Sequence, residues 1–160
     1  MTELRSFGEI KFFVPGLPKT AGSKRVFMVK GRPIITDDNA KSKDWKSDIK
    51  HFAIDMMKEI PPFDCALEVT FEFLLPRPKS HFGKLGIRKS APGYPRGRPD
   101  VLKLSRAVED ALSGICWKDD AQIVSEKLRK RYAFNESPGC WITVSTAPGE
   151  EEYALSKGSS

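Results

Sequence analysis

The stretch from Arg98 to Tyr132, RPDVLKLSRAVEDALSGICWKDDAQIVSEKLRKRY, decides the fold class. Asp100 is a residue type that caps helix N-termini, and Gly114 is one that ends helices. Between them apolar residues recur at helical spacing: Leu104, Val108, Ala111 and Leu112. We therefore expect a helix from about Val101 to Ser113, followed by a strand from about Ile123 to Tyr132.

The remaining segments extend this pattern on both sides. Residues 66–75 (ALEVTFEFLL) alternate apolar and polar side chains and predict a half-buried strand. We expect further strands at residues 7–14 and 141–146, a hairpin at 25–29 and 33–35, and a helix at about 40–59, with N-cap candidates Asp37, Asp38 and Asn39. This order predicts a single α/β domain over residues 1–147, in which two main helices pack on a mixed β-sheet, and a flexible tail over 148–160.

The composition narrows the class of protein. The chain has 160 residues, with 27 Lys and Arg against 21 Asp and Glu. The net charge of +6 favours an anionic partner, most often nucleic acid. The start of the chain has no apolar signal region, and the three cysteines have no metal-ligand spacing. We therefore expect a cytoplasmic protein that neither crosses a membrane nor depends on disulfides.

The segment from Arg77 to Arg98 is rich in Pro, Gly and cations and contains no acidic residue. Such a segment cannot bury enough apolar surface to order itself, so we expect a mobile loop in the free protein. Its cations suit DNA phosphates, and Phe82 and Tyr94 could stack on unpaired bases. A solvated linker is the other interpretation. Acidic residues are present elsewhere in the chain and absent from this segment, which favours contact with nucleic acid over a solvated linker.

Two further basic groups lie elsewhere in the chain. One surrounds the turn at Pro15-Gly16, and the other lies on the strand predicted from Ile123, where alternate residues share a face. With the loop and the start of the second helix they give the candidate DNA-binding residues: Lys19, Lys24, Arg25, Lys79, Lys84, Arg88, Lys89, Arg96, Arg98, Lys103, Lys127, Arg129 and Arg131.

Asp100, Asp119 and Asp120 are the candidate metal ligands. Helix capping and exposed turns would explain these residues one at a time. Two adjacent aspartates repel each other, however, and a cation would hold such a pair together. Mg²⁺ takes a few carboxylates and completes its shell with water and phosphate oxygens. We therefore expect the three aspartates to converge on one ion, Mg²⁺ or Mn²⁺, that supports phosphodiester hydrolysis.

The pattern PD-x-x-K-L-x-R-A-V-x-DAL-x-G from Pro99, followed by W-x-DDAQI from Trp117, resembles the signature of the RusA family of Holliday junction resolvases. The segment VPGLPK from Val14 resembles the opening of that family. The resemblance implies a small α/β homodimer, common in bacteria and their phages, that cuts four-way DNA junctions with Mg²⁺ in recombination and repair. It implies catalytic roles for Asp100 and Asp120, and it makes Arg106 the counterpart of a functional lysine.

Leu102 departs from the family pattern. The family has an aspartate at this position and an asparagine at the next, where this chain has Leu102 and Lys103. Leucine cannot bind Mg²⁺, so three outcomes stay open. The three aspartates suffice, or Glu109 or Asp110 compensates, or the protein binds branched DNA as an accessory factor with an impaired active site. An RNA-binding module is disfavoured, because no aromatic-rich sheet motif is present. We expect an active endonuclease.

Overall fold

A computed structural model describes residues 4–6, 8–21, 24–37 and 40–150, with side chains for 8–21, 30–32 and 44–150. Five strands form the main sheet in the order β1-β2-β9-β5-β8. Their bounds are β1 Leu4–Ser6, β2 Glu9–Pro15, β5 Leu67–Leu75, β8 Ile123–Tyr132 and β9 Gly139–Thr146. Strand β8 pairs with β5 in parallel and the other neighbours pair antiparallel, so the predicted mixed sheet is confirmed.

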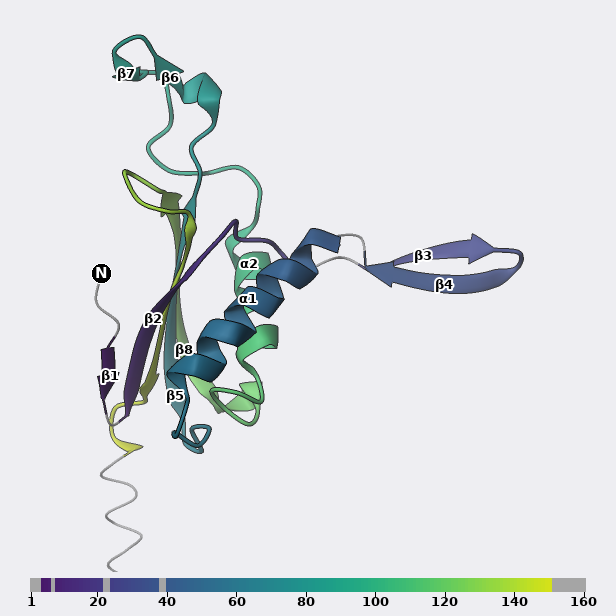
Figure 1. Cartoon of the computed structure of the whole chain (residues 1–160), viewed down its shortest axis with the longest axis vertical. Helices are drawn as coiled ribbons and strands as arrows, with labels where there is room; N and C mark the ends of the chain where they lie inside the picture. Colours follow the sequence, from purple (N-terminus) through teal and green to yellow (C-terminus); the bar gives the residue numbers. More distant parts are fainter. Residues whose placement is uncertain (1–3, 7, 22–23, 38–39, 151–160) are drawn as a thin grey trace, which may run out of the picture.

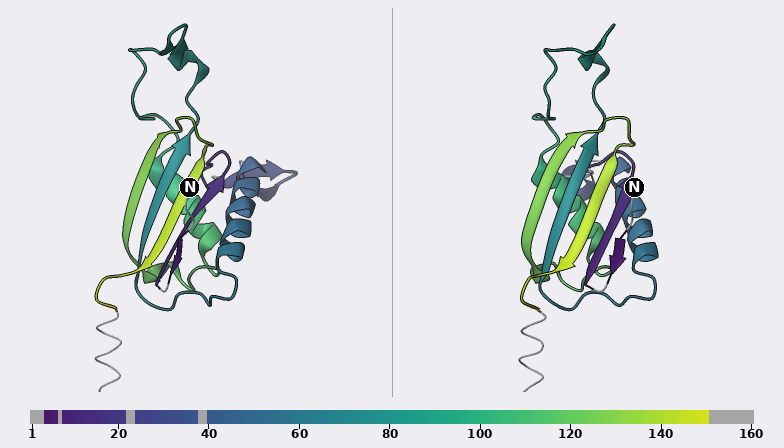
Figure 2. Two further views of the ribbon diagram at one scale, coloured as in Figure 1. Left: turned by 60° about the vertical axis from the view of Figure 1, so that its left-hand side comes forward. Right: turned by 90° about the vertical axis from the view of Figure 1, so that its left-hand side faces the viewer.

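Two helices, α1 Ala40–Met56 and α2 Val101–Leu112, cover one face of this sheet (Figure 1). Alternate residues of β5 point into the core between the layers, with Leu67, Val69, Phe71 and Phe73 buried. The apolar stripe predicted on α2 is buried against them. No described helix covers the other face, which Figure 2 shows from the front.

The connection from β5 to β8 runs through α2, because parallel neighbours need a long crossover. Strands β8 and β9 are consecutive in sequence and are joined by residues 133–138. They are nevertheless not partners, since β5 lies between them. Glycine is required at 139, where a Cβ would lie 2.3 Å from the carbonyl oxygen of Val14 on β2.

The hairpin predicted after the first strand is present as β3 Lys24–Val29 and β4 Arg32–Asp37, which form a separate two-stranded sheet. Lys30 and Gly31 both have positive φ angles, as a tight two-residue hairpin turn requires. The side chains of Lys24 and Arg25 lie outside the description, as do the N-cap candidates Asp38 and Asn39.

At the C-terminal end, Glu150 accepts a hydrogen bond from the backbone N–H of Ala66, and residues 151–160 lie outside the description. Flexibility of the tail therefore stays a prediction. In the described part of the chain no helix is long and apolar enough to cross a membrane.

Candidate nucleic-acid interface and carboxylate cluster

The basic segment Arg77–Arg98, which we call the arm, extends beyond the end of the sheet (Figure 1). It contains a short 3-10 turn, Lys79–His81, and a small hairpin of β6 Phe82–Gly83 and β7 Gly86–Ile87. Sequence reasoning missed these elements, because two-residue strands give no periodic signal. Mobility of the arm in solution stays a prediction.

Two cations, Arg77 and Lys130, fix the foot of the arm to the domain through contacts with other residues. Arg77 donates to the carbonyl oxygen of Pro92 at 2.8 Å, and its guanidinium lies 4.2 Å from the centre of the Tyr132 ring. Lys130 donates to the carbonyl oxygens of Gly97 and Pro99 at 2.6 and 2.8 Å. Arg77 and Lys130 are thus structural.

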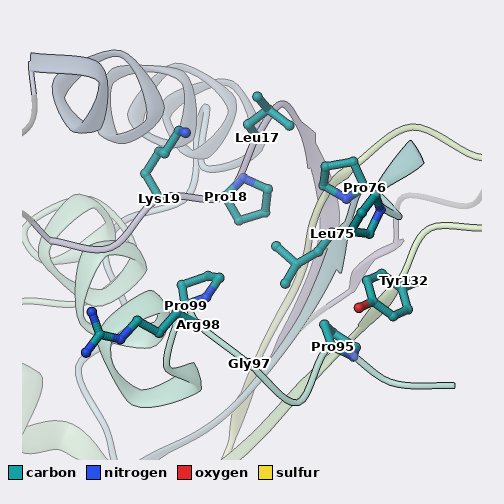
Figure 3. Close-up of a pocket in the computed structure, with 11 residues that line it drawn as sticks. Leu17, Pro18, Lys19, Leu75, Pro76, Pro95, Gly97, Arg98, Pro99 and Tyr132 are labelled. Atoms are coloured by element: carbon teal, nitrogen blue, oxygen red, sulfur yellow. The ribbon is translucent and has the colours of Figure 1, made fainter. Parts of the chain in front are cut away.

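The outer cations of the arm are exposed. They are Lys79, Lys84, Arg88, Lys89, Arg96 and Arg98. Arg88 also donates through Nε to the carbonyl oxygen of Phe82 and so holds the hairpin. Lys19, from the turn after β2, and Arg98 and Pro99, from the end of the arm, all line a pocket at the foot of the arm (Figure 3). The arm and the first turn therefore present their positive charge at the same end of the domain.

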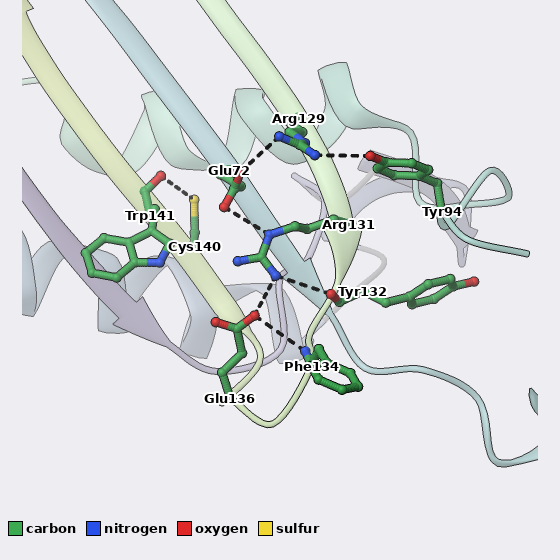
Figure 4. Close-up of polar contacts among 9 residues, drawn as sticks. All are labelled: Glu72, Tyr94, Arg129, Arg131, Tyr132, Phe134, Glu136, Cys140 and Trp141. Carbon is green, nitrogen blue, oxygen red and sulfur yellow. Dashed lines mark hydrogen bonds and ion pairs between the residues drawn. The ribbon is translucent and has the colours of Figure 1, made fainter. Parts of the chain in front are cut away.

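Three cations of β8 share one face, as the alternation predicted, and it is the face that the helices leave open: Lys127, Arg129 and Arg131. Two of them are engaged by one carboxylate (Figure 4). Glu72 of β5 pairs with Arg129 at 3.8 Å and with Arg131 at 3.0 Å. Arg131 also donates to Glu136, and this hydrogen bond lowers the pKa of Glu136. Lys127 has no ion pair among the described residues, so it is the β8 cation most available to phosphate.

Asp100 caps α2 as predicted. Its Oδ1 accepts hydrogen bonds from the backbone N–H groups of Leu102 and Lys103 at 2.9 and 3.3 Å. Leu102 is 66% exposed, on the outer surface of the helix. Positions 102, 106 and 109 follow i, i+4, i+7 spacing, so Leu102, Arg106 and Glu109 share one face of α2.

The ion pair of Asp110 is with the other helix and not with Arg106, which lies four residues before it in α2. Asp110 pairs with Lys46 of α1 at 3.4 Å. Asp110 thereby links the two helices, which reduces its suitability as the compensating carboxylate. Arg106 instead lies near Glu109, where its charge acts to lower the pKa of that carboxyl.

The adjacent aspartates lie beyond the other end of α2. Asp119 caps a 3-10 turn, Asp120–Gln122, and its Oδ1 accepts from the N–H of Ala121 at 2.8 Å. Asp120 Oδ1 accepts from the indole N–H of Trp117 at 2.7 Å. Because Trp117 is fully buried, it fixes the position of Asp120 from below.

Glu109, Asp120 and Glu126 form a carboxylate cluster around a hollow of about 350 Å³. Burial, the hydrogen bond with Glu126 and the nearby charges of Glu126 and Asp120 together raise the pKa of Glu109 to about 8. Sequence reasoning named Glu109 as a possible compensating group and missed Glu126. The signal for Glu126 was its alternation with Ser125 and Lys127, which turns it toward α2.

The structure does not bring Asp100 together with Asp119 and Asp120 within one chain. Asp100 precedes helix α2, which has 12 residues and is about 18 Å long, whereas Asp120 lies beside Glu109 in the last turn of that helix. Among the described residues no group of three or more His, Cys, Asp or Glu is placed to hold a metal ion. The donors at the hollow are nonetheless of the type that Mg²⁺ prefers. A cation would also offset the repulsion from Glu126 and Asp120 that, after burial, contributes to the raised pKa of Glu109.

Comparison with known proteins identifies the family. The sequence profile of the family described as endodeoxyribonuclease RusA matches residues 15–145, which is well over half of the chain. No curated protein matches the chain with significant similarity. The matched range contains the arm, α2 and the carboxylate cluster. The chain therefore belongs to the RusA endodeoxyribonuclease family.

Proposed function

We propose that this protein is a structure-selective DNA endonuclease that resolves four-way junctions by metal-dependent phosphodiester hydrolysis, as a homodimer in the bacterial cytoplasm or in a phage-infected cell. Membership of an endodeoxyribonuclease family supports the nuclease activity. The observation that carries the proposal further is the arrangement along α2, which has an acid-free cationic arm at its N-terminal end and a carboxylate cluster near its C-terminal end.

The cationic end binds the DNA backbone in this proposal. Lys19, Lys84, Lys89, Arg96 and Arg98 contact phosphates and supply affinity that falls as salt rises. Lys103, exposed on the first turn of α2, extends this surface toward the cluster. Lys127 adds one cation on β8, whereas Arg129 and Arg131 contribute less because Glu72 engages both.

The acidic end carries the chemistry. Asp120 and Glu109, with Glu126 beside them, would hold a divalent ion, Mg²⁺ or Mn²⁺. When bound, such an ion supplies charge neutralisation and an activated water. Trp117 orients Asp120 through its indole N–H. Arg106, on the same face of α2 as Glu109, offsets negative charge on the phosphate that is cut in this proposal.

The homodimer gives Asp100 a role. A four-way junction presents two equivalent strands, and paired cuts need two sites related by two-fold symmetry. Within one chain Asp100 and Asp120 lie near opposite ends of α2, which leaves Asp100 without a share in the same ion. We propose that Asp100 of one chain acts with Asp120 and Glu109 of the other.

A binding protein with an impaired site is the second candidate, and Leu102 is the observation that favours it. The test is incision of a synthetic four-way junction in the presence of Mg²⁺ or Mn²⁺, with linear duplex and excess chelator as controls. Our proposal predicts metal-dependent incision of the junction and much slower incision of the duplex. Tight junction binding without incision in either metal would favour the second candidate.

A further inference from the structure

A pocket of about 330 Å³ lies at the foot of the arm, on the side of the domain that carries the N-terminus of α2 (Figure 3). The turn after β2, the ends of β5 and β8, and the last residues of the arm surround it. Its volume is at the lower end of the range for small-molecule sites. Arg98 and Pro99, the two residues before Asp100 in the chain, are part of its lining.

The walls of the pocket are mostly apolar. Proline rings from three segments contribute to them, together with Leu17, Leu75 and the ring of Tyr132. Leu17 is 52% exposed although it is a large apolar side chain. A binding partner that covered Leu17 would remove this apolar surface from water.

Contacts within the protein hold these walls in place. The guanidinium of Arg77 stacks on Tyr132, and the His81 ring meets the same tyrosine edge-on at 5.6 Å. The two hydrogen bonds from Lys130 fix the backbone at Gly97 and Pro99. The pocket is therefore formed before any ligand enters, which limits the entropy lost on binding.

The charges around the pocket are of one sign. Lys19 and Arg98 lie at one end, and Tyr132 and Pro76 lie at the other (Figure 3). None of the described side chains that line the pocket is acidic. Within the described part of the chain, neither Lys19 nor Arg98 forms an ion pair. The ligand that fits has a flat apolar body and an anionic end.

We propose that this pocket binds one unstacked nucleotide of the DNA substrate, with the base against Leu17, Tyr132 and the proline rings and the phosphate between Lys19 and Arg98. This inference rests on the proposed function. A base that is paired and stacked in a duplex cannot enter, whereas a base at a branch point can be displaced at lower cost. The pocket thus contributes to selection of branched over linear DNA.

The experiment measures binding of four-way junctions in which a single abasic residue is moved through the nucleotides around the branch point. Chelator prevents cleavage. For the wild-type protein we expect one position at which loss of the base weakens binding about tenfold, the scale of a base stacked on protein groups. The phosphate stays in place at an abasic residue, so the loss reports the base alone.

The Leu17→Ala variant decides whether that base occupies this pocket. It should bind the intact junction several-fold more weakly and should lose most of the sensitivity to the abasic position. Ile54→Ala is the matched control, because Ile54 is a 60% exposed aliphatic residue on α1 and lines no part of the pocket. It should keep the full tenfold effect. Thermal melting of both variants verifies the fold.

Lys19→Ala separates the phosphate from the base. It should weaken binding of intact and abasic junctions equally and should lower the log–log salt slope by about 0.7 to 0.9. If Leu17→Ala and the abasic residue weaken junction binding independently, so that their fold-losses in affinity multiply, the pocket takes no base. The same conclusion follows if no abasic position weakens binding. In either case strong junction binding would leave the proposed nuclease function standing. Failure of the wild-type protein to bind any junction would overturn the proposed function.

Discussion

Leu102 occupies the second position of α2, exposed to solvent and one turn before Arg106. A carboxylate at this position would lie on the helix face that leads to Glu109, and negative charge in the first turn of a helix is favourable by about 0.3 to 1 kcal/mol. Leucine offers neither a ligand nor this charge. Nothing in the structure requires an apolar side chain here, since the residue contributes nothing to the core.

Leu102→Asp should therefore raise the rate of junction cleavage at low Mg²⁺ without loss of stability. The added carboxylate would increase affinity for the ion, so the metal concentration at half-maximal rate should fall several-fold. Leu102→Asn is the matched control, with nearly the same shape and no charge. If Leu102→Asp and Leu102→Asn behave alike in a metal titration, another residue already fills the role, and Glu109 is the first candidate.

Glu109 gives a prediction that does not depend on DNA. Its pKa is raised from 4.5 to about 8 in the fold. The folded state thus holds this proton more tightly than the unfolded chain does, and the resulting stability is fully present below pH 4.5 and is lost as the pH rises through about 8.

Glu109→Gln keeps the shape and cannot ionise, so it should flatten the fall in the free energy of unfolding between pH 5 and pH 8. Denaturant unfolding with chelator present measures the free energy of unfolding at each pH. Asp55→Asn, at an exposed carboxyl of α1, serves as the control and should leave the fall unchanged. A fall of the same size in Glu109→Gln and wild type would show that this carboxyl is not perturbed as described.

At the scale of elements, the arm is the part of the fold whose function is easiest to isolate. It extends away from the core, and its outer lysines can be removed without disturbing Arg77 and Lys130 at its foot. Arg88 is best left in place, because it donates to the Phe82 carbonyl oxygen within the hairpin.

The double variant Lys84→Ala, Lys89→Ala should weaken binding of all junction sequences alike. Each lost phosphate contact lowers the slope of log affinity against log salt by about 0.9. Lys50→Ala on α1 is a single-charge control outside the arm. A double variant that retains the wild-type slope would mean that the arm does not bind the DNA backbone.

The elements that the sequence predicted best are those with strong periodicity. Strand β5 and helix α2 were predicted to within a residue or two, because alternation and helical spacing both reflect burial on one side. The three-residue β1 was missed for lack of any period. The insertion of β5 between β8 and β9 was also missed, since pairing between distant segments leaves no local pattern.

The candidate site was predicted only in part for a related reason. The sequence shows that Asp100 and Asp120 flank a helix but does not show that the helix keeps them apart. Glu126 was missed because it lies in a strand dominated by cations, where its orientation toward Glu109 depends on how β8 packs against α2.

For the whole molecule, the separation of Asp100 from Asp120 leads to a prediction about assembly. Light scattering should give a dimer of the 17.9 kDa chain. Asp100→Asn and Asp120→Asn should each abolish cleavage. When the two variants are mixed and allowed to exchange subunits, half of the sites in a mixed dimer regain both aspartates, and cleavage should return in part.

If the mixture of the two variants stays inactive after verified subunit exchange, each active site takes both aspartates from one chain. A chain that remains monomeric with and without junction DNA would contradict the proposed assembly altogether. Either result would require α2 and the segment of Asp120 to rearrange on DNA before the two carboxylates could act together.

The most direct test of the central claim compares wild type with Asp120→Asn on a labelled four-way junction with Mg²⁺, measuring cleavage and binding in parallel. Asparagine keeps the acceptor for the Trp117 indole N–H and removes the charge, so the fold and the DNA surface should be preserved. We predict paired, symmetry-related cuts by the wild type, no cuts by Asp120→Asn, and junction binding by the variant that is equal or tighter. Cleavage by Asp120→Asn at the wild-type rate would contradict the account.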